Sequence, residues 1–391
     1  MSRPTFEVAD IVQAQGARYV DSHRDQISYQ QLKVLHAIAR CRTAALGGHI
    51  DDCPRCGHKA ISYNSCRDRH CPKCQAQARQ RWLAAREKEL LGVPYFHLVF
   101  TLPHELIPLC QRNPRILYNL LFRASAATML EIAADPKHLG AEIGFLSILH
   151  TWGQNLLAHP HVHCVIPAGG LSADHTRWVH PKYPFFLPVK VLGRVFRGKF
   201  VDGLKREHRK KKLQFPPANA ALEDPKNFLR FLRTLFREDW VVYAKPAFGG
   251  APQVLRYLGR YTHRVAISNH RLLAFDGERV TFRWKDYARG NKQRTMTLTA
   301  AEFLRRFLQH VLPRGFVRIR HFGFLANSCR TARLGVSRRL LAVTPKPRES
   351  CVRLDSDAGA WRCPRCGGPM RIGPNLTAMQ LASRCCFIDS S

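Results

Sequence analysis

Apolar side chains recur with helical spacing near the start of the chain. Between residues 25 and 46 they return about every 3.6 positions, which predicts an amphipathic helix that Gly47 and Gly48 end. A strongly charged run over residues 75–91 predicts a second helix, closed by Gly92 and Pro94. A cysteine-rich segment lies between these two predicted helices.

Short apolar runs replace this pattern from Phe96 onward and predict strands, followed or separated by helices. The predicted strands cover residues 96–102, 144–152, 161–166 and 240–244, with paired strands over 270–298. The predicted helices cover residues 113–134, 251–264 and about 300–311. This mixed order differs from a regular alternation of strand and helix, so it favours an α+β fold with a largely antiparallel sheet.

Changes in residue composition along the chain predict two domains and a carboxy-terminal segment. Residues 1–94 form a helical, cysteine-rich amino-terminal domain, and residues 95–330 form the larger α+β domain. Residues 331–391 form a linker followed by a second, smaller group of cysteines.

The charge of the chain indicates its partner. Lys and Arg number 62 against 28 Asp and Glu among 391 residues, a formal net charge of +34, while 45% hydrophobic residues suffice for a packed core. A charge this large is typical of proteins that bind nucleic acid. No apolar stretch of membrane-spanning length and no export signal stands out, so we expect a cytoplasmic, nucleoid-associated protein without a membrane partner.

Two Cys-x2-Cys pairs indicate a metal site. Cys53, Cys56, Cys71 and Cys74 have the residue types and spacing that wrap one tetrahedral zinc ion. A second zinc ion or exchanged ligands remain open, because other candidate ligands lie close by, namely His58, Cys66 and His70. Cys363 and Cys366 form one further pair, with Cys351, Cys385 or Cys386 as candidates to complete it.

A histidine-rich strand suggests a second kind of metal site. His161 and His163 lie two positions apart, so on a strand both imidazoles share one face while Val162 faces the opposite layer. Two such imidazoles can hold one divalent cation. The sequence leaves the remaining ligand open among His150, His159, Gln154 and Glu105.

A predicted helix carries two phenols beside a row of cations. Tyr257 and Tyr261 are spaced i and i+4, so they would lie one above the other. A neighbouring stripe of guanidiniums could clamp phosphates and consists of Arg256, Arg260 and Arg264. A phenol is a poor nucleophile at neutral pH, yet it can attack a phosphate that a metal ion polarises.

Taken together, these motifs resemble a known family. The His-Val-His run at residues 161–163, the two-tyrosine segment from Tyr257 to His270 and the cysteine cluster over 53–75 resemble the rolling-circle transposases of the insertion sequence 91 family. The resemblance covers roughly residues 30–330 and requires three motifs in the right order.

This resemblance implies a specific chemistry. It implies an HUH-type central antiparallel sheet flanked by helices and an HUH single-strand DNA endonuclease and transesterase. It further implies 5′-phosphotyrosine intermediates, Mg²⁺ or Mn²⁺ at the histidines and Zn²⁺ at the cysteines. The expected partners are single-stranded DNA and hairpin element ends, with host replication proteins as candidates. The sequence leaves the oligomeric state open.

Two further readings remain, and one motif is set aside. An HUH plasmid replication initiator or relaxase would use the same chemistry, and a non-catalytic zinc DNA-binding protein would use the histidines and tyrosines only structurally. The run Gly193 to Lys199 imitates a phosphate-binding loop, but Phe200 stands where a Ser or Thr should reach Mg²⁺. We therefore expect no nucleotide cofactor.

Overall fold

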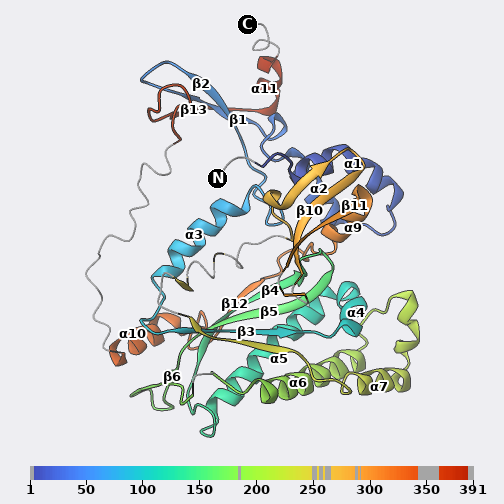
Figure 1. The fold of residues 1–391 in the computed structure, drawn as a ribbon, viewed down its shortest axis with the longest axis vertical. Coiled ribbons are helices and arrows are strands. Elements are labelled where there is room, and N and C mark those ends of the chain that lie inside the picture. The colour runs from blue at the N-terminus through green and yellow to red at the C-terminus, as the bar shows by residue number, and fades with distance from the viewer. Residues whose placement is uncertain are drawn as a thin grey trace.

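A five-stranded antiparallel sheet lies at the centre of the computed structural model (Figure 1). The structure describes residues 4–183, 186–248, 253–254, 259, 266–286, 289–290, 292–341 and 361–385. The strands follow the order β12-β4-β5-β3-β8. Their bounds are β3 Tyr95–Thr101, β4 Gly144–Trp152, β5 Ala158–Pro167, β8 Val242–Phe248 and β12 Ile319–Gly323. Every pairing in this sheet is antiparallel, which confirms the predicted α+β class.

Helices cover one face of this sheet. They are α4 Ile107–Arg112, α5 Pro114–Ala134, α6 Val189–Arg209 and α7 Pro225–Thr234, and α5 to α7 lie beneath the sheet in Figure 1. Because side chains alternate along a strand, Val162, Cys164 and Ile166 of β5 enter the core shared with these helices. His161 and His163 therefore point to the opposite face.

Helix α5 is the apolar helix of the molecule. By length and composition alone it could cross a membrane, and this corrects the expectation that no stretch reaches that length. However, 67% of its most apolar window is buried inside the fold, where Leu117, Leu121 and Met129 join the core under the sheet. Its apolar character is therefore accounted for by packing against α6, β4 and β5.

A second lobe combines the start of the chain with a segment near residue 300. Helices α1 Val8–Ser22 and α2 Tyr29–Arg40 pack with α9 Ala300–Leu308 around one apolar core. The same core receives side chains from the meander of β9 Leu272–Phe275, β10 Arg279–Asp286 and β11 Lys292–Thr299. The first part of the chain thus does not pack on itself alone, and the boundaries near residues 94 and 330 stay predictions.

A small three-stranded ribbon joins the two ends of the chain. Strand β1 Gly48–Asp52 pairs on one side with β2 Lys59–Tyr63 and on the other with β13 Arg371–Leu376. Helix α11 Ala378–Cys385 follows β13, and the ribbon and α11 lie together at the top of Figure 1. Helix α3 Gln75–Glu87 runs from this region down towards α10 Arg330–Leu340.

Short elements complete the part of the chain that the structure describes. These are the strands β6 Gly170–Leu171 and β7 Trp178–Val179 and the 3-10 helices η1 Ala44–Leu46, η2 His104–Leu106, η3 Pro217–Glu223 and η4 Asn269–Arg271.

Most predicted elements occur close to the expected positions. The strand predicted at 144–152 is β4, and the paired strands predicted over 270–298 are β9, β10 and β11, with Gly277 at φ 98° in the turn between β9 and β10. The helix predicted over 25–46 is shorter, because α2 begins after the Ser28 cap and ends at Arg40. The run Gly193 to Lys199 lies inside α6, where a helical backbone cannot wrap around a phosphate as a loop does.

Candidate metal centres and DNA-contacting residues

Three histidines meet on the sheet face opposite α5 and α6. The ring atoms His150 Nδ1 and His161 Nε2 each lie 3.1 Å from His163 Nε2. The antiparallel register of β4 and β5 places His150 directly across from His161. All three side chains are buried and their ligand atoms lie within 4.8 Å of one another. Facial ligands of an octahedral ion at about 2.1 Å lie about 3.0 Å apart, so the spacing fits one divalent cation.

Neighbouring groups orient two of these imidazoles. The His161 Nδ1–H can donate to the backbone carbonyl of His159 at 2.6 Å, which leaves Nε2 free to bind a metal. On the other side, His163 Nδ1 lies 2.9 Å from His97 Nε2 on β3. Burial lowers the pKa of both His161 and His97 to about 3, so both rings are neutral at physiological pH.

The structure distinguishes among the candidates for the third metal ligand. His150 completes the cluster, whereas Glu105 and His159 form no such group with His161 and His163 among the described residues, and Gln154 stays a prediction. Glu105 lies in η2 with 42% of its side chain exposed, 3.4 Å from His104. His159 contributes its backbone carbonyl to the site.

The four cysteines predicted to share one zinc ion are divided between two clusters, which corrects the expected ligand set. Cys71 and Cys74 lie with Cys41 and Cys66, while Cys53 and Cys56 lie at the ribbon with Cys363 and Cys366. The reason is the fold: strands β1 and β2 carry the first Cys-x2-Cys pair away from the loop that precedes α3.

The first cluster has the geometry of a tetrahedral thiolate site. Cys74 Sγ lies 3.5 Å from Cys41 Sγ and 3.6 Å from Cys66 Sγ. Sulfur atoms about 2.3 Å from a tetrahedral zinc ion lie about 3.8 Å apart, so these thiols fit Zn²⁺. Hydrogen bonds from the Cys66 and Cys71 thiols lower the pKa of Cys41, while the hydrogen bond with Cys41 raises the pKa of Cys66.

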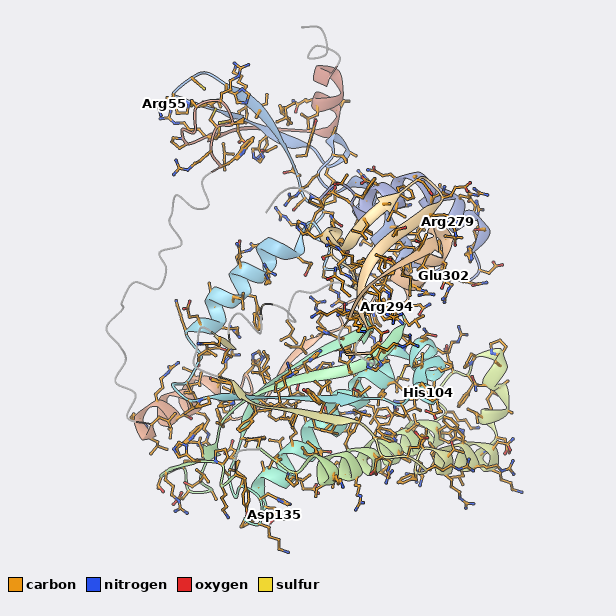
Figure 2. The ribbon with its side chains drawn as sticks, viewed as in Figure 1. Arg55, His104, Asp135, Arg279, Arg294 and Glu302 are labelled. Atoms are coloured by element: carbon orange, nitrogen blue, oxygen red, sulfur yellow. The ribbon has the colours of Figure 1, made fainter. Side chains whose placement is uncertain are left out.

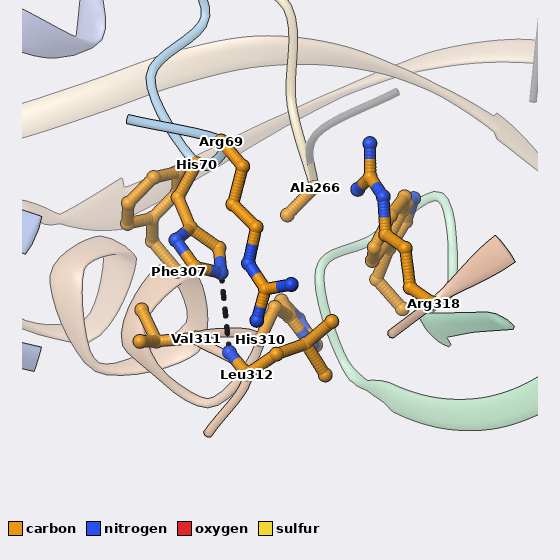
Figure 3. Close-up of a pocket in the computed structure, with 9 residues that line it drawn as sticks. Arg69, His70, Ala266, Phe307, His310, Val311, Leu312 and Arg318 are labelled. Carbon is orange, nitrogen blue, oxygen red and sulfur yellow. Dashed lines mark hydrogen bonds between the residues drawn. The ribbon is translucent and has the colours of Figure 1, made fainter. Parts of the chain in front are cut away.

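The loop held by this first cluster is fastened to the segment before β12. The backbone N–H of Leu312 donates to His70 Nε2 at 3.1 Å (Figure 3). On its other side, His70 Nδ1 lies 3.0 Å from Asp68 Oδ1. The Arg69 guanidinium donates to the carbonyls of Pro313 at 3.0 Å and Phe316 at 2.5 Å. His70 therefore attaches this loop to Leu312 by a hydrogen bond and does not belong to the cysteine cluster.

Two arginines line a pocket beside the histidine cluster. It is lined by residues of α9, of β4, of the segment before β12 and of the loop between Cys66 and Cys74. Ala266 also lines it, as do Arg69, Trp152 and Arg318 (Figure 3). The Trp152 ring stacks on His150 with centroids 4.7 Å apart, so the pocket adjoins the proposed metal position. Burial and the nearby Arg69 lower the pKa of Arg318 to about 10, and it remains a cation at neutral pH. Two guanidiniums therefore line this small cavity of about 10 Å³.

The two-tyrosine segment falls almost entirely outside the described residues. Tyr257 and Tyr261 lie outside them, as do Arg256, Arg260 and Arg264, so their positions stay predictions. Two neighbouring residues, Val254 and Gly259, are described. Val254 is buried in the apolar cluster on the histidine side of the sheet, and a β-carbon on Gly259 would lie 3.0 Å from Leu83 of α3.

Comparisons with known proteins identify the family of this chain. A family model described as "Transposase zinc-binding domain" of insertion sequence 91 matches residues 11–102, and one described as "Putative transposase" matches residues 144–332. "Putative transposase y4qJ" of Sinorhizobium fredii is 53% identical over 351 residues, which cover 90% of this chain and 88% of that protein. The chain belongs to the insertion sequence 91 family of transposases.

A more distant relative extends the comparison. The "Transposase for insertion sequence element IS801" of Pseudomonas savastanoi pv. phaseolicola is 28% identical over 357 residues, with 87% of this chain and 82% of that protein covered. No solved structure matches the chain. Membership of this transposase family supports DNA as the substrate, and the zinc-binding match together with the cysteine clusters supports Zn²⁺.

Sequence reasoning missed one ligand of this transposase's first cysteine cluster. Cys41 follows α2 as an isolated cysteine, without the Cys-x2-Cys spacing that marks the others. No local signal marks it, because the chain has 14 cysteines and only the fold selects Cys41 from among the unpaired ones.

Proposed function

We propose that this chain is the transposase of a bacterial insertion sequence that cuts and rejoins single-stranded DNA by rolling-circle chemistry. The observation that carries the proposal is the cluster of His150, His161 and His163 on one buried sheet face in a chain of the transposase family. A metal-binding group of neutral imidazoles beside an arginine-lined pocket suits a reaction at a phosphodiester.

His150, His161 and His163 would hold the Mg²⁺ or Mn²⁺ ion. When bound, such an ion acts as a Lewis acid that polarises the scissile phosphate and stabilises its developing charge. The His159 carbonyl fixes the tautomer of His161 through its 2.6 Å hydrogen bond, and His97 does the same for His163 at 2.9 Å. Because His161 is neutral when buried, no proton has to leave it before a metal binds.

Tyr257 and Tyr261 are the proposed nucleophiles. The phenol oxygen of one tyrosine attacks the scissile phosphorus, forms a tyrosine-phosphate ester at the 5′ end and gives up its proton. The bond from phosphorus to the 3′ oxygen breaks, and that oxygen takes up a proton and leaves as a free hydroxyl. The ester preserves the energy of the broken phosphodiester, so a later attack by a 3′ hydroxyl can reseal DNA without a nucleotide cofactor.

Arginines steady the DNA in this proposal. The predicted stripe of Arg256, Arg260 and Arg264 would contact phosphates beside the tyrosines, and Arg69 and Arg318 line the pocket next to His150. The net charge of +34 supplies the general attraction for the strand. Single-stranded DNA and hairpin element ends are the proposed substrates. The proposed site of action is the cytoplasm at the nucleoid, with host replication proteins as candidate partners.

The first cysteine cluster has a structural role in this scheme. A zinc ion at Cys41, Cys66, Cys71 and Cys74 would tie the end of α2 to the start of α3. The loop between Cys66 and Cys74 carries Arg69 and His70, which dock on residues 312–316. Zinc would therefore set the position of Arg69 in the pocket.

Two other functions are outcomes of the test. A plasmid replication initiator or relaxase shares the cleavage step, and the transposase family matches favour transposition over both. A non-catalytic zinc DNA-binding protein would bind DNA without cutting it. Metal-dependent nicking of one strand separates that last reading from the enzymes.

The test is to trap the covalent adduct on labelled single-stranded DNA with Mn²⁺ present and to map it by mass spectrometry. We expect an adduct on Tyr257 or Tyr261 in the native protein. Tyr257→Phe and Tyr261→Phe should each retain adduct formation at the other tyrosine while losing complete strand transfer. If one variant loses all adduct and the other transfers normally, a single tyrosine acts. An absent adduct in the native protein, with DNA binding retained, contradicts the proposed chemistry.

A further inference from the structure

A second group of four thiols is assembled from opposite ends of the chain. Cys53 Sγ lies 3.5 Å from Cys366 Sγ, and Cys56 Sγ lies 3.6 Å from Cys363 Sγ, although more than 300 residues separate each pair. The four sulfur atoms all lie within 4.8 Å of one another. This spacing is too long for disulfide bonds of about 2.05 Å and agrees with the roughly 3.8 Å edge of a zinc tetrathiolate.

The two halves of this cluster are copies of one local structure. Both read Cys-Pro-Arg-Cys-Gly, at residues 53–57 and 363–367. In the first, the Gly57 N–H donates to the Cys53 carbonyl at 2.9 Å, and the Cys53 N–H donates to the His58 carbonyl at 2.8 Å.

The second half repeats these contacts. The Gly367 N–H donates to the Cys363 carbonyl at 2.9 Å, and the Cys363 N–H donates to the Gly368 carbonyl at 2.8 Å. Gly57 has φ 70° and Gly367 has φ 68°, a left-handed conformation that favours glycine in both turns. Each turn thus presents two thiols from one tight loop, and the two loops face each other.

The strands beneath the turns hold this arrangement in register. β13 pairs with β1, with Arg371 opposite Asp52, directly below both turns. The ribbon has few buried apolar side chains that could stabilise it without a metal ion. Within the described part of the chain, none of the three apolar clusters includes a residue of 48–63 or 361–376, and Ile372 is 79% exposed. A small element without a core generally needs a metal or a disulfide.

We infer that Cys53, Cys56, Cys363 and Cys366 bind a second Zn²⁺ ion, which closes a zinc ribbon from both ends of the chain. The transposase zinc-binding match stops at residue 102 and so does not include Cys363 and Cys366. The ion fastens the carboxy-terminal segment to the amino-terminal ribbon, and the exposed side chain of Arg55 projects at the ribbon's tip (Figure 2). The protein therefore carries two zinc ions, each with four thiolates.

The experiment measures zinc per chain in the full-length protein purified without chelator. We expect two zinc ions in the native protein and one in each of Cys363→Ser and Cys53→Ser, which remove ligands from opposite ends of the chain. Cys66→Ser should also retain one ion, lost from the other site. Cys329→Ser is the matched control and should retain two, because Cys329 belongs to neither cluster and its Sγ lies 3.7–3.8 Å from backbone carbonyls. One ion in the native protein, or two in Cys363→Ser, overturns the inference.

Thiol alkylation of the native protein supplies a readout that does not depend on any variant folding. Cys53, Cys56, Cys363 and Cys366 should resist alkylation together and become reactive together when a chelator is added. In Cys363→Ser, Cys53 and Cys56 should become reactive while Cys41 and Cys74 stay protected. If Cys363 and Cys366 react in the zinc-loaded native protein while Cys53 and Cys56 do not, the shared site is contradicted. Neither readout depends on DNA cleavage.

Discussion

The Nδ1 atom of His150 lies 3.1 Å from the Nε2 atom of His163, across the pairing of β4 with β5. His163 lies on β5 beside His161, but His150 comes from the neighbouring strand and was one of several candidates in the sequence. The sheet therefore turns a two-histidine motif into a three-nitrogen group. Such a group can hold a cation and still leave coordination positions for a phosphate and water.

His150→Ala should strongly reduce metal-dependent cleavage of single-stranded DNA while leaving DNA binding within about twofold, because it removes one of the three proposed metal ligands and no surface cation. We expect cleavage to fall by more than about 100-fold, beyond the 10–100-fold that loss of an outer-shell contact typically causes. His104→Ala is the control, since the His104 side chain is 85% exposed and lies in η2 outside the cluster. Cleavage by His150→Ala at the native rate would remove His150 from the ligand set.

A second prediction concerns His97, which contacts His163 and not the metal position. His97→Leu removes the 2.9 Å partner of His163 Nδ1, so the imidazole loses its fixed tautomer and orientation. Mn²⁺ affinity should fall by about 10–100-fold. A metal titration of cleavage should show a higher half-saturating concentration with near-native activity at saturation. An unchanged titration curve, or a loss of activity that metal cannot restore, would argue that His97 serves another purpose.

Four strands of the central sheet could be predicted because they are short apolar runs with clear ends. The edge strand β12 was not predicted, since Arg320 and His321 interrupt its apolar pattern. The strand predicted at 144–152 coincides with β4, and the alternation of His161, Val162 and His163 gave the correct faces of β5. Periodicity depends only on neighbouring positions, so it gives elements and faces reliably where burial is one-sided.

Contacts between distant segments could not be predicted in this way. Cys41 joins Cys66 and Cys363 joins Cys56 only because strand pairing brings their segments together. Likewise, α1 and α2 pack with α9 from the far side of the sequence, which no local pattern reveals. Thiol spacing along the chain shows that metal sites exist, but the pairing of β1 with β13 decides which cysteines share an ion.

Arg318 provides a test of the pocket as a phosphate site. Its backbone carbonyl accepts a hydrogen bond from the N–H of Leu149 at 2.9 Å, which places it beside the residue that precedes His150. If its side chain neutralises one phosphate of single-stranded DNA, Arg318→Ala should reduce the slope of log affinity against log salt by about 0.7. Arg194→Ala is the charge-matched control, because Arg194 is exposed on α6 under the opposite sheet face. Equal slopes for the two variants would mean that Arg318 makes no specific phosphate contact.

Glu302 links the second lobe to the hairpin that carries the histidines. Its carboxylate accepts hydrogen bonds from Arg305 at 2.5 Å and from Arg306 at 2.6 Å, and Arg306 also donates to the carbonyl of Asn155 at 3.0 Å. Asn155 lies in the turn between β4 and β5, while Glu302 lies in α9 of the second lobe (Figure 2). The hydrogen bonds from Arg305 and Arg306 lower the pKa of Glu302 to about 2.

Glu302→Gln should destabilise the protein by about 1–2 kcal/mol at pH 7. The lowered pKa of Glu302 alone corresponds to a larger stabilisation, and solvent screening reduces it because 31% of the side chain is exposed. The folded-state pKa lies below the unfolded value, so this stabilisation is present above pH 4–5 and is lost as the pH falls towards about 2. Urea unfolding at pH 7 and pH 3 should therefore show a difference between native protein and variant that shrinks at the lower pH. The exposed Glu278 gives the control variant Glu278→Gln, which should show little change at either pH. A difference of the same size at both pH values would rule out the carboxylate charge as the cause.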